Sequence, residues 1–147
     1  GGAVTLGPGI IGAEANALLA AHGRKIGPDP ASINACMIGG IVANNASGMC
    51  CGTSQNTYRT LERMRLVLAD GTVLDSGDPA SRRALAESHW AALEGLSAIR
   101  EEILADEALS ARIREKYRIK NTTGYGLNSF LDHEDPVDIL VHLMVGS

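Results

Sequence analysis

One long stretch that is almost free of charge constrains this chain more than any other feature. From Ile26 to Tyr58 the only charged side chain is that of Asp29, although 20% of all residues in the chain are charged. Disorder requires low hydrophobicity, and this run does not have it. We therefore expect the segment Gly27–Gly52, called the cradle segment below, to be buried or covered by a ligand. Its apolar side chains are Ile33, Met37, Ile38, Ile41 and Val42.

The centre of the cradle segment combines two glycines with polar side chains. Gly39 and Gly40 lack Cβ atoms, so the backbone there can approach a partner closely or turn sharply. Asn44, Asn45 and Ser47 follow with hydrogen-bond donors and acceptors. The segment has no lysine, so an anion would be held by backbone N–H groups assisted by amide and hydroxyl side chains. The spacing fits a ligand cradle made of backbone, and it fits equally well a helix end capped by asparagine.

Length, charge and composition exclude several classes of protein. A chain of 147 residues forms one domain with a core and is too short for two full ones. A net charge of −4 and 3% aromatic residues argue against a nucleic-acid-binding surface. No apolar run reaches the length of a membrane span, and three cysteines make no disulfide framework. We expect a cytoplasmic protein, and we expect this chain to be a piece of a longer one.

The N-terminal segment carries a pattern with two interpretations. Ala3–Leu6 is predicted to be a short strand, and helical spacing of apolar residues predicts a helix over Ile11–Ala21 that is capped near Gly23. Between them, Gly7–Gly12 matches the G-x-G-x-x-G fingerprint of a Rossmann NAD-binding domain. The second parallel strand that this fold requires has no room before the prolines at 28 and 30. A tight turn is therefore favoured over the fingerprint.

The rest of the chain predicts an antiparallel hairpin followed by helices. Asp70-Gly71 lies between the apolar runs Leu61–Ala69 and Thr72–Leu74, a strong hairpin signal. The first of these strands is expected to be buried on both faces at one end, because its last residues are continuously apolar. Helices are expected to begin at three aspartates that can act as N-caps: Asp78, Asp106 and Asp135.

Metal and nucleophile chemistry find little support in the sequence. The four histidines are far apart, and Cys36 with Cys50 and Cys51 lacks the C-x-x-C spacing of a structural zinc site. No G-x-S-x-G motif is present, and no basic residue stands beside the paired cysteines to lower a thiol pKa. We therefore assign no metal ligand and no catalytic residue.

Several motifs together resemble one known family, the FAD-binding domain of the vanillyl-alcohol oxidase/p-cresol methylhydroxylase type. The segment Met49–Thr53 looks most like the large bacterial FAD-linked dehydrogenases of D-lactate and D-2-hydroxyglutarate. The similarity extends over essentially the whole chain. The motifs that carry it are Pro28–Ser32, Ile38–Gly40, Ala43–Gly48, Val67–Leu74, Asn121–Leu127 and His142–Ser147.

The resemblance implies an α+β fold in which a mostly antiparallel sheet is flanked by helices. Residues 1–147 would form the second subdomain of a two-part FAD-binding domain. The first subdomain with its diphosphate loop, the substrate cap and any iron–sulfur extension would lie outside the chain, and with them the catalytic and metal residues. Peripheral attachment to the inner face of the membrane then becomes an alternative to a free cytoplasmic location.

The implied activity is oxidation of a D-2-hydroxy acid such as D-lactate, D-2-hydroxyglutarate or a glycolate-like acid. A hydride would pass to N5 of FAD, and the electrons would continue to an external acceptor. The isolated chain is expected to be inactive. The alternatives are a Rossmann-type NAD-binding domain and a non-catalytic flavin-binding or structural module.

The resemblance also implies which residues contact the cofactor. Three groups match positions in this family that lie near the flavin, its diphosphate or its ribityl chain, and Gly124 with Tyr125 are weaker candidates. The groups are Ser32, Gly40, Asn44, Asn45, Ala46 and Ser47 lining the site; Met37 and Gly39 flanking it; and Pro8-Gly9 as a turn beside the ribityl chain.

Overall fold

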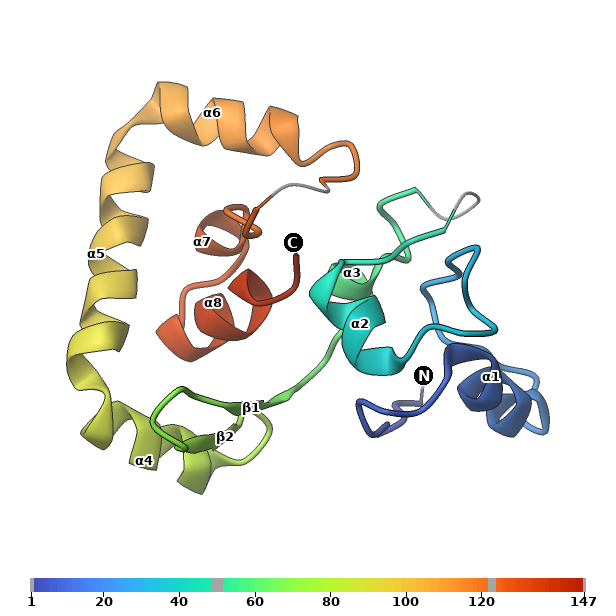
Figure 1. Cartoon of the computed structure of the whole chain (residues 1–147). Coiled ribbons are helices and arrows are strands. Elements are labelled where there is room, and N and C mark those ends of the chain that lie inside the picture. The colour runs from blue at the N-terminus through green and yellow to red at the C-terminus, as the bar shows by residue number, and fades with distance from the viewer. Residues whose placement is uncertain (1, 49–51, 122–123, 147) are drawn as a thin grey trace. The chain divides into compact units, whose positions relative to one another are not determined.

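The computed structural model describes residues 2–48, 52–121 and 124–146, and the chain divides into two compact units (Figure 1). The first unit comprises Gly1–Glu62, Arg118–Gly124 and Val145–Ser147, and the second comprises Arg63–Tyr117 and Tyr125–Met144. The helices of the first unit are α1 (Gly12–Ala20), α2 (Ile38–Ala43) and α3 (Thr57–Thr60). The second unit contains β1 (Arg65–Val67), β2 (Val73–Asp75), α4 (Pro79–Ser88), α5 (Trp90–Ala105), α6 (Glu107–Lys116), α7 (Ser129–Asp132) and α8 (Pro136–Leu143).

Helix α1 confirms the predicted helix at Ile11–Ala21 to within one residue at each end. Gly23 follows it with a φ of 63°, the left-handed conformation expected of a C-terminal cap. The helix packs closely through Gly12, where a Cβ atom would overlap the side chain of Ile33. The third glycine of the G-x-G-x-x-G pattern thus serves helix packing.

The predicted strand at Ala3–Leu6 is wrong, because residues 2–7 form no regular structure. A strand needs a neighbour to complete its hydrogen bonds, and the described residues supply none to this segment. The turn that follows is present, with the amide of Ile10 donating to the carbonyl of Gly7 at 3.3 Å. Without a parallel strand before it, this turn does not open a Rossmann unit.

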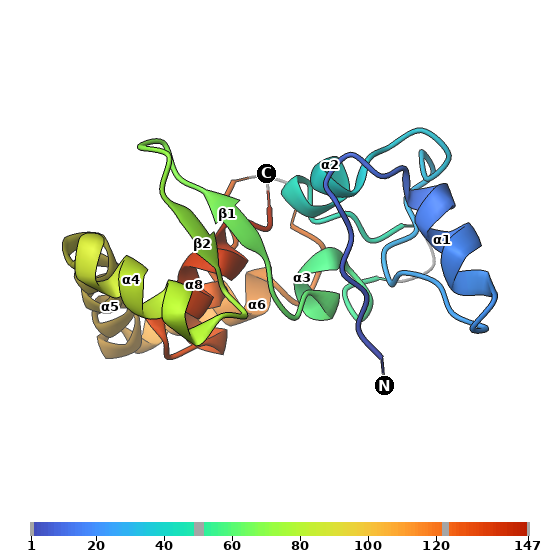
Figure 2. The same ribbon diagram turned by 90° about the horizontal axis from the view of Figure 1, so that it is seen from below.

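The hairpin predicted at Asp70-Gly71 is confirmed, with shorter strands than expected. Strands β1 and β2 pair antiparallel, with Leu66 opposite Leu74. Gly71 has a φ of 87°, and the Asp70 carboxylate accepts from the amide of Thr72 at 2.9 Å. Figure 2 shows the strands lying beside α4, and Leu74 is fully buried.

The other face of the hairpin corrects the prediction that one end of the first strand is buried on both sides. Val67 is 71% exposed and Val73, which pairs with it, is 53% exposed. A strand is buried on both faces only when other elements cover both. Only the face that carries Leu74 is covered here.

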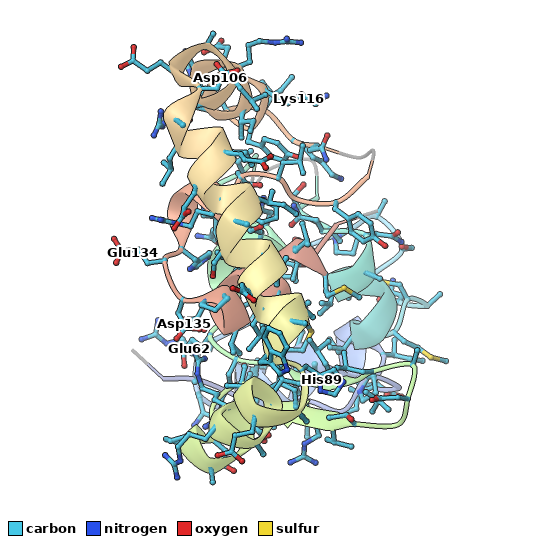
Figure 3. The ribbon with its side chains drawn as sticks, turned by 90° about the vertical axis from the view of Figure 1, so that its left-hand side faces the viewer. Glu62, His89, Asp106, Lys116, Glu134 and Asp135 are labelled. Atoms are coloured by element: carbon cyan, nitrogen blue, oxygen red, sulfur yellow. The ribbon has the colours of Figure 1, made fainter. Side chains whose placement is uncertain are left out.

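Three aspartates begin helices as predicted, and the helices of the second unit enclose a core. The carboxylates of Asp78, Asp106 and Asp135 accept amide hydrogen bonds from the first turns of α4, α6 and α8. Figure 3 shows His89 and Asp106 at opposite ends of α5, which contacts α6, α7 and α8. The predicted α+β class is confirmed. One buried hydrophobic cluster of this unit consists of Ile103, Ile113, Phe130 and Ile139.

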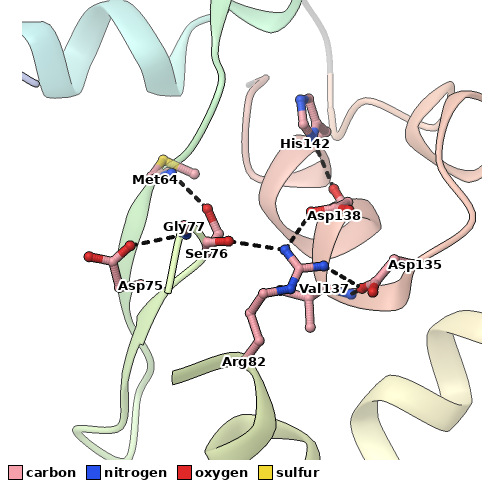
Figure 4. A network of polar contacts seen from close by, with 9 residues as sticks. All are labelled: Met64, Asp75, Ser76, Gly77, Arg82, Asp135, Val137, Asp138 and His142. Carbon is pink, nitrogen blue, oxygen red and sulfur yellow. Dashed lines mark hydrogen bonds and ion pairs between the residues drawn. The ribbon is translucent and has the colours of Figure 1, made fainter. Parts of the chain in front are cut away.

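Arg82 joins α4 to α8 through a polar network (Figure 4). Its guanidinium lies 2.9 Å from the carboxylate of Asp135 and 2.7 Å from that of Asp138, and it donates to the carbonyl of Ser76 at 3.1 Å. The hydrogen bond from Arg82 is the main cause that lowers the pKa of Asp138, and the same bond raises the pKa of Arg82. The ionised pair is therefore favoured in the folded protein.

No helix within the described ranges is long and apolar enough to cross a membrane.

Candidate functional site

The turn at Pro8-Gly9 is tied directly to the start of α2. The amide of Gly39 donates to the carbonyl of Pro8 at 2.9 Å, and the amide of Ile38 donates to that of Ile10 at the same distance. Ile11 and Met37 form an isolated antiparallel bridge next to these bonds. The structure thus brings together Pro8, Gly9, Met37 and Gly39, which the sequence predicted to contact a cofactor from two separate segments.

The two neighbouring glycines of α2 have different surroundings. A Cβ atom on Gly39 would lie 3.2 Å from the Cβ of Pro8 and 3.3 Å from its carbonyl oxygen, so Gly39 allows the close approach of the turn. A Cβ atom on Gly40 would meet nothing within 4 Å. Gly40 therefore presents bare backbone to open space, where a ligand has room.

Asn44 and Asn45 end α2, and the structure shows that Asn45 caps the helix, whereas its contact with a cofactor stays a prediction. Asn45 has a φ of 43°, the amide of Ala46 donates to Ile41 at 2.9 Å, and the amide of Asn45 donates to Val42 at 3.0 Å. These two bonds define a Schellman motif. The side-chain oxygen of Asn45 accepts from the amide of Tyr58 at 3.0 Å, so its capping function is established, while Asn44 is exposed.

Ser47 carries a buried hydroxyl. The residue is 1% exposed, and its Oγ has no hydrogen-bond partner among the residues that the structure describes. A buried polar atom without a partner costs free energy, and an oxygen-rich ligand would satisfy it. The backbone around it is fixed, because the amide of Asp29 donates to the Ser47 carbonyl at 3.1 Å.

The remaining predicted residues differ in how the structure uses them. The carbonyl of Ser32 accepts from Ala35 and Cys36 in an exposed turn, and Ala46 is buried. Tyr125 belongs to the second unit, where its carbonyl accepts from the Tyr117 hydroxyl at 2.8 Å, and Gly124 is exposed with a φ of 72°. Contact of these residues with a cofactor stays a prediction.

The sequence analysis did not identify the residues of α3 that hydrogen-bond to the cradle segment. Asn56, Thr57 and Tyr58 are all buried, and each takes part in hydrogen bonds at the start of α3. The Asn56-Thr57 pair is a typical N-cap signal, so it could have predicted the start of α3. It could not have predicted that α3 packs against the cradle segment.

The structure does not describe every residue of the sequence motifs. Met49, Cys50 and Cys51, like Thr122 and Thr123, lie outside the described residues. Within the described ranges no group of three or more histidine, cysteine, aspartate and glutamate side chains could hold a metal ion.

Comparisons with known proteins point to one cofactor. Residues 1–77 match the family described as FAD binding domain. The glycolate oxidase subunit GlcD of Escherichia coli strain K12 is 36% identical to this chain over 73 residues, and the GlcD of E. coli strain O6:H1 matches equally. The aligned part spans 50% of this chain and only 15% of the length of either relative. No solved structure matches the chain.

Proposed function

Because this chain belongs to the FAD binding domain family, we propose that its cradle segment forms one wall of the FAD site in an oxidoreductase that oxidises a D-2-hydroxy acid. The observation that carries the proposal is the open space at Gly40, where an added Cβ atom would meet no atom of another segment within 4 Å. The buried Oγ of Ser47, in the same segment, supports it, since it has no hydrogen-bond partner within the described part of the chain.

The chain's own residues would bind and orient the cofactor. Backbone N–H groups and the Ser47 hydroxyl suit the oxygens of a diphosphate, and the turn at Pro8-Gly9 would flank the ribityl chain. The cradle segment carries no lysine, so binding would depend on geometry more than on charge. FAD, when bound, supplies the acceptor for the substrate hydride at its N5 atom.

The substrate class rests on the relatives. Both are named as subunits of a glycolate oxidase, and glycolate is a 2-hydroxy acid. The proposal includes an external electron acceptor, a cytoplasmic location, and the placement of residues 1–147 as the second subdomain of a two-part FAD domain. The catalytic groups would lie in other parts of the whole protein.

The proposal is tested on the full-length protein through its visible spectrum and through one variant. Wild type is expected to be yellow as purified, or to become so with added FAD. Gly40→Val places a side chain in the open space and is expected to abolish flavin retention while the protein stays folded. The control is Gly95→Val, because Gly95 also lies in a helix and a Cβ there also meets nothing within 4 Å.

Two results would contradict the proposal at different levels. A colourless protein that FAD cannot reconstitute would overturn FAD binding, and a folded Gly40→Val that stays yellow would overturn the site. Substrate class is checked by anaerobic bleaching of the flavin absorbance with glycolate, D-lactate and D-2-hydroxyglutarate. Bound flavin that none of these acids bleaches would instead support the non-catalytic module.

A further inference from the structure

One buried hydroxyl lies where the turn after α2 closes. The Oγ1 atom of Thr57 lies 3.1 Å from the carbonyl oxygen of Ile41 and 3.1 Å from that of Ala46. The amide of Thr57 also donates to Ala46 at 3.1 Å. Thr57 is 4% exposed. A threonine hydroxyl has a single proton, so it is shared between these two carbonyls.

These two carbonyls belong to the two ends of the Schellman turn. Ile41 lies in α2 directly after Gly40, and Ala46 directly precedes Ser47. The amide of Ala46 already donates to Ile41 at 2.9 Å, and the amide of Tyr58 holds the Asn45 side chain at 3.0 Å. The first turn of α3 therefore fixes the path of the chain between Gly40 and Ser47.

Each of the two carbonyls keeps another donor when the hydroxyl is removed. Ile41 still accepts from the amide of Ala46, and Ala46 still accepts from the amide of Thr57. Loss of the hydroxyl thus leaves no carbonyl unpaired, which limits its cost to folding. What it removes is the donor that contacts both carbonyls at once, and with it a constraint on the separation of Gly40 and Ser47.

We propose that Thr57 is a positioning residue for the FAD site, whose hydroxyl sets the geometry of Gly40 and Ser47 without contacting the cofactor. This inference rests on the proposed function, since it assumes that the cradle segment binds FAD. It concerns a side chain outside the cradle segment that none of the family motifs includes.

The test compares three variants of the full-length protein after removal of bound FAD. Thr57→Val keeps the shape and removes the hydroxyl, and Thr57→Ser keeps the hydroxyl. Thr60→Val is the matched control, because the Thr60 hydroxyl bonds to carbonyls of its own turn of α3, those of Asn56 at 2.9 Å and Thr57 at 3.4 Å. Affinity is measured by FAD fluorescence, and the saturated forms are compared by visible circular dichroism of the flavin.

Thr57→Val is expected to weaken the Kd for FAD about tenfold, because displacement of Gly40 or Ser47 would cost about one hydrogen bond to the cofactor, and to change the flavin dichroism. Thr57→Ser and Thr60→Val are expected to match wild type in both measurements. Should Thr57→Val fail to fold, Thr57→Cys replaces it, since a thiol is a weaker donor, and an intermediate Kd is expected.

The outcomes separate this inference from the proposed function. Failure of wild type to bind FAD would overturn both. If wild type binds FAD and Thr57→Val or its cysteine replacement binds as tightly, the inference falls and the proposed function stands. Failure of Thr57→Ser to restore the affinity, or an equal loss in Thr60→Val, would show that the hydroxyl is not what positions the site.

Discussion

Gly48 stands where a side chain has no room. Its φ is 86°, and a Cβ atom there would overlap the carbonyl oxygen of Asp29, whose amide bonds to the neighbouring Ser47. Gly48→Ala is therefore expected to lower the free energy of unfolding by more than the roughly 1–2 kcal/mol that a left-handed backbone costs a residue with a Cβ. Urea denaturation of the protein measures this loss.

Gly71 provides the control for the effect of the left-handed backbone alone. Its φ of 87° is nearly the same, but a Cβ atom there would meet nothing within 4 Å. Gly71→Ala is expected to lower the free energy of unfolding only by the roughly 1–2 kcal/mol that the left-handed backbone costs. Equal losses in the two variants would contradict the close approach of Asp29 to Gly48.

At the scale of elements, α4 and α8 are joined by Arg82 and its two carboxylate partners. Arg82→Met keeps most of the aliphatic stem and removes both ion pairs. Because the side chains of Asp135 and Asp138 are 51% and 41% exposed, solvent screening limits the expected loss at neutral pH to about 1 kcal/mol. Urea denaturation at low and high salt checks it, and the loss is expected to shrink as salt rises.

The same pair predicts a pH dependence. The pKa of Asp138 is lowered in the folded protein, chiefly by the hydrogen bond from Arg82, so its ionised form stabilises the fold above the pKa of the unfolded chain, about 3.9. This contribution is lost as the pH falls through the lower, folded pKa. The stability difference between wild type and Arg82→Met is thus expected to vanish in acid.

Arg65→Met is the comparison for this element, since Arg65 pairs with Asp75 at 3.2 Å and is 71% exposed. Arg65→Met is expected to lower the free energy of unfolding less than Arg82→Met does. If the two variants lost equal stability, the network between α4 and α8 would be no more than an ordinary surface contact.

At the scale of the whole molecule, the family match and the two compact units do not coincide. Residues 1–77 match the family, and they include the hairpin of the second unit as well as most of the first unit. The predicted cofactor contacts nevertheless concentrate in the first unit, from Pro8 to Ser47. FAD binding should therefore protect the two units unequally.

Hydrogen exchange of the full-length protein tests this distribution. At FAD concentrations near 100 times the Kd, bound protein gains about 2.7 kcal/mol over unbound protein. Slower exchange is expected for peptides covering Met37–Ser47, and little change for α6, which serves as the internal reference. Equal protection of both, or protection of α6 alone, would contradict a cradle in the first unit.

The sequence by itself determined the elements whose signals lie between near neighbours in the chain. The aspartate N-caps of α4, α6 and α8 and the glycine turn of the hairpin depend on residues two or three positions apart, so local patterns predicted them correctly. The lack of charge in the cradle segment predicted a buried or ligand-covered surface; the structure leaves part of it exposed, with Met37 at 54%, and cover by a ligand stays a prediction. The strand at Ala3–Leu6 and the double burial of β1 were wrong, because both require neighbours that a local pattern does not contain.

Only the tertiary structure decided which contacts the cradle residues make within the chain. The spacing of Asn45 fits a cap and a ligand contact equally, and the bond that secures the cap comes from Tyr58, thirteen positions away. Gly39 and Gly40 are neighbouring residues of the same type, but Pro8 lies close to Gly39 and leaves Gly40 open. Thr57 reaches back sixteen residues to Ile41. Contacts of this separation depend on how the chain folds back on itself, and no window of neighbouring residues specifies that path.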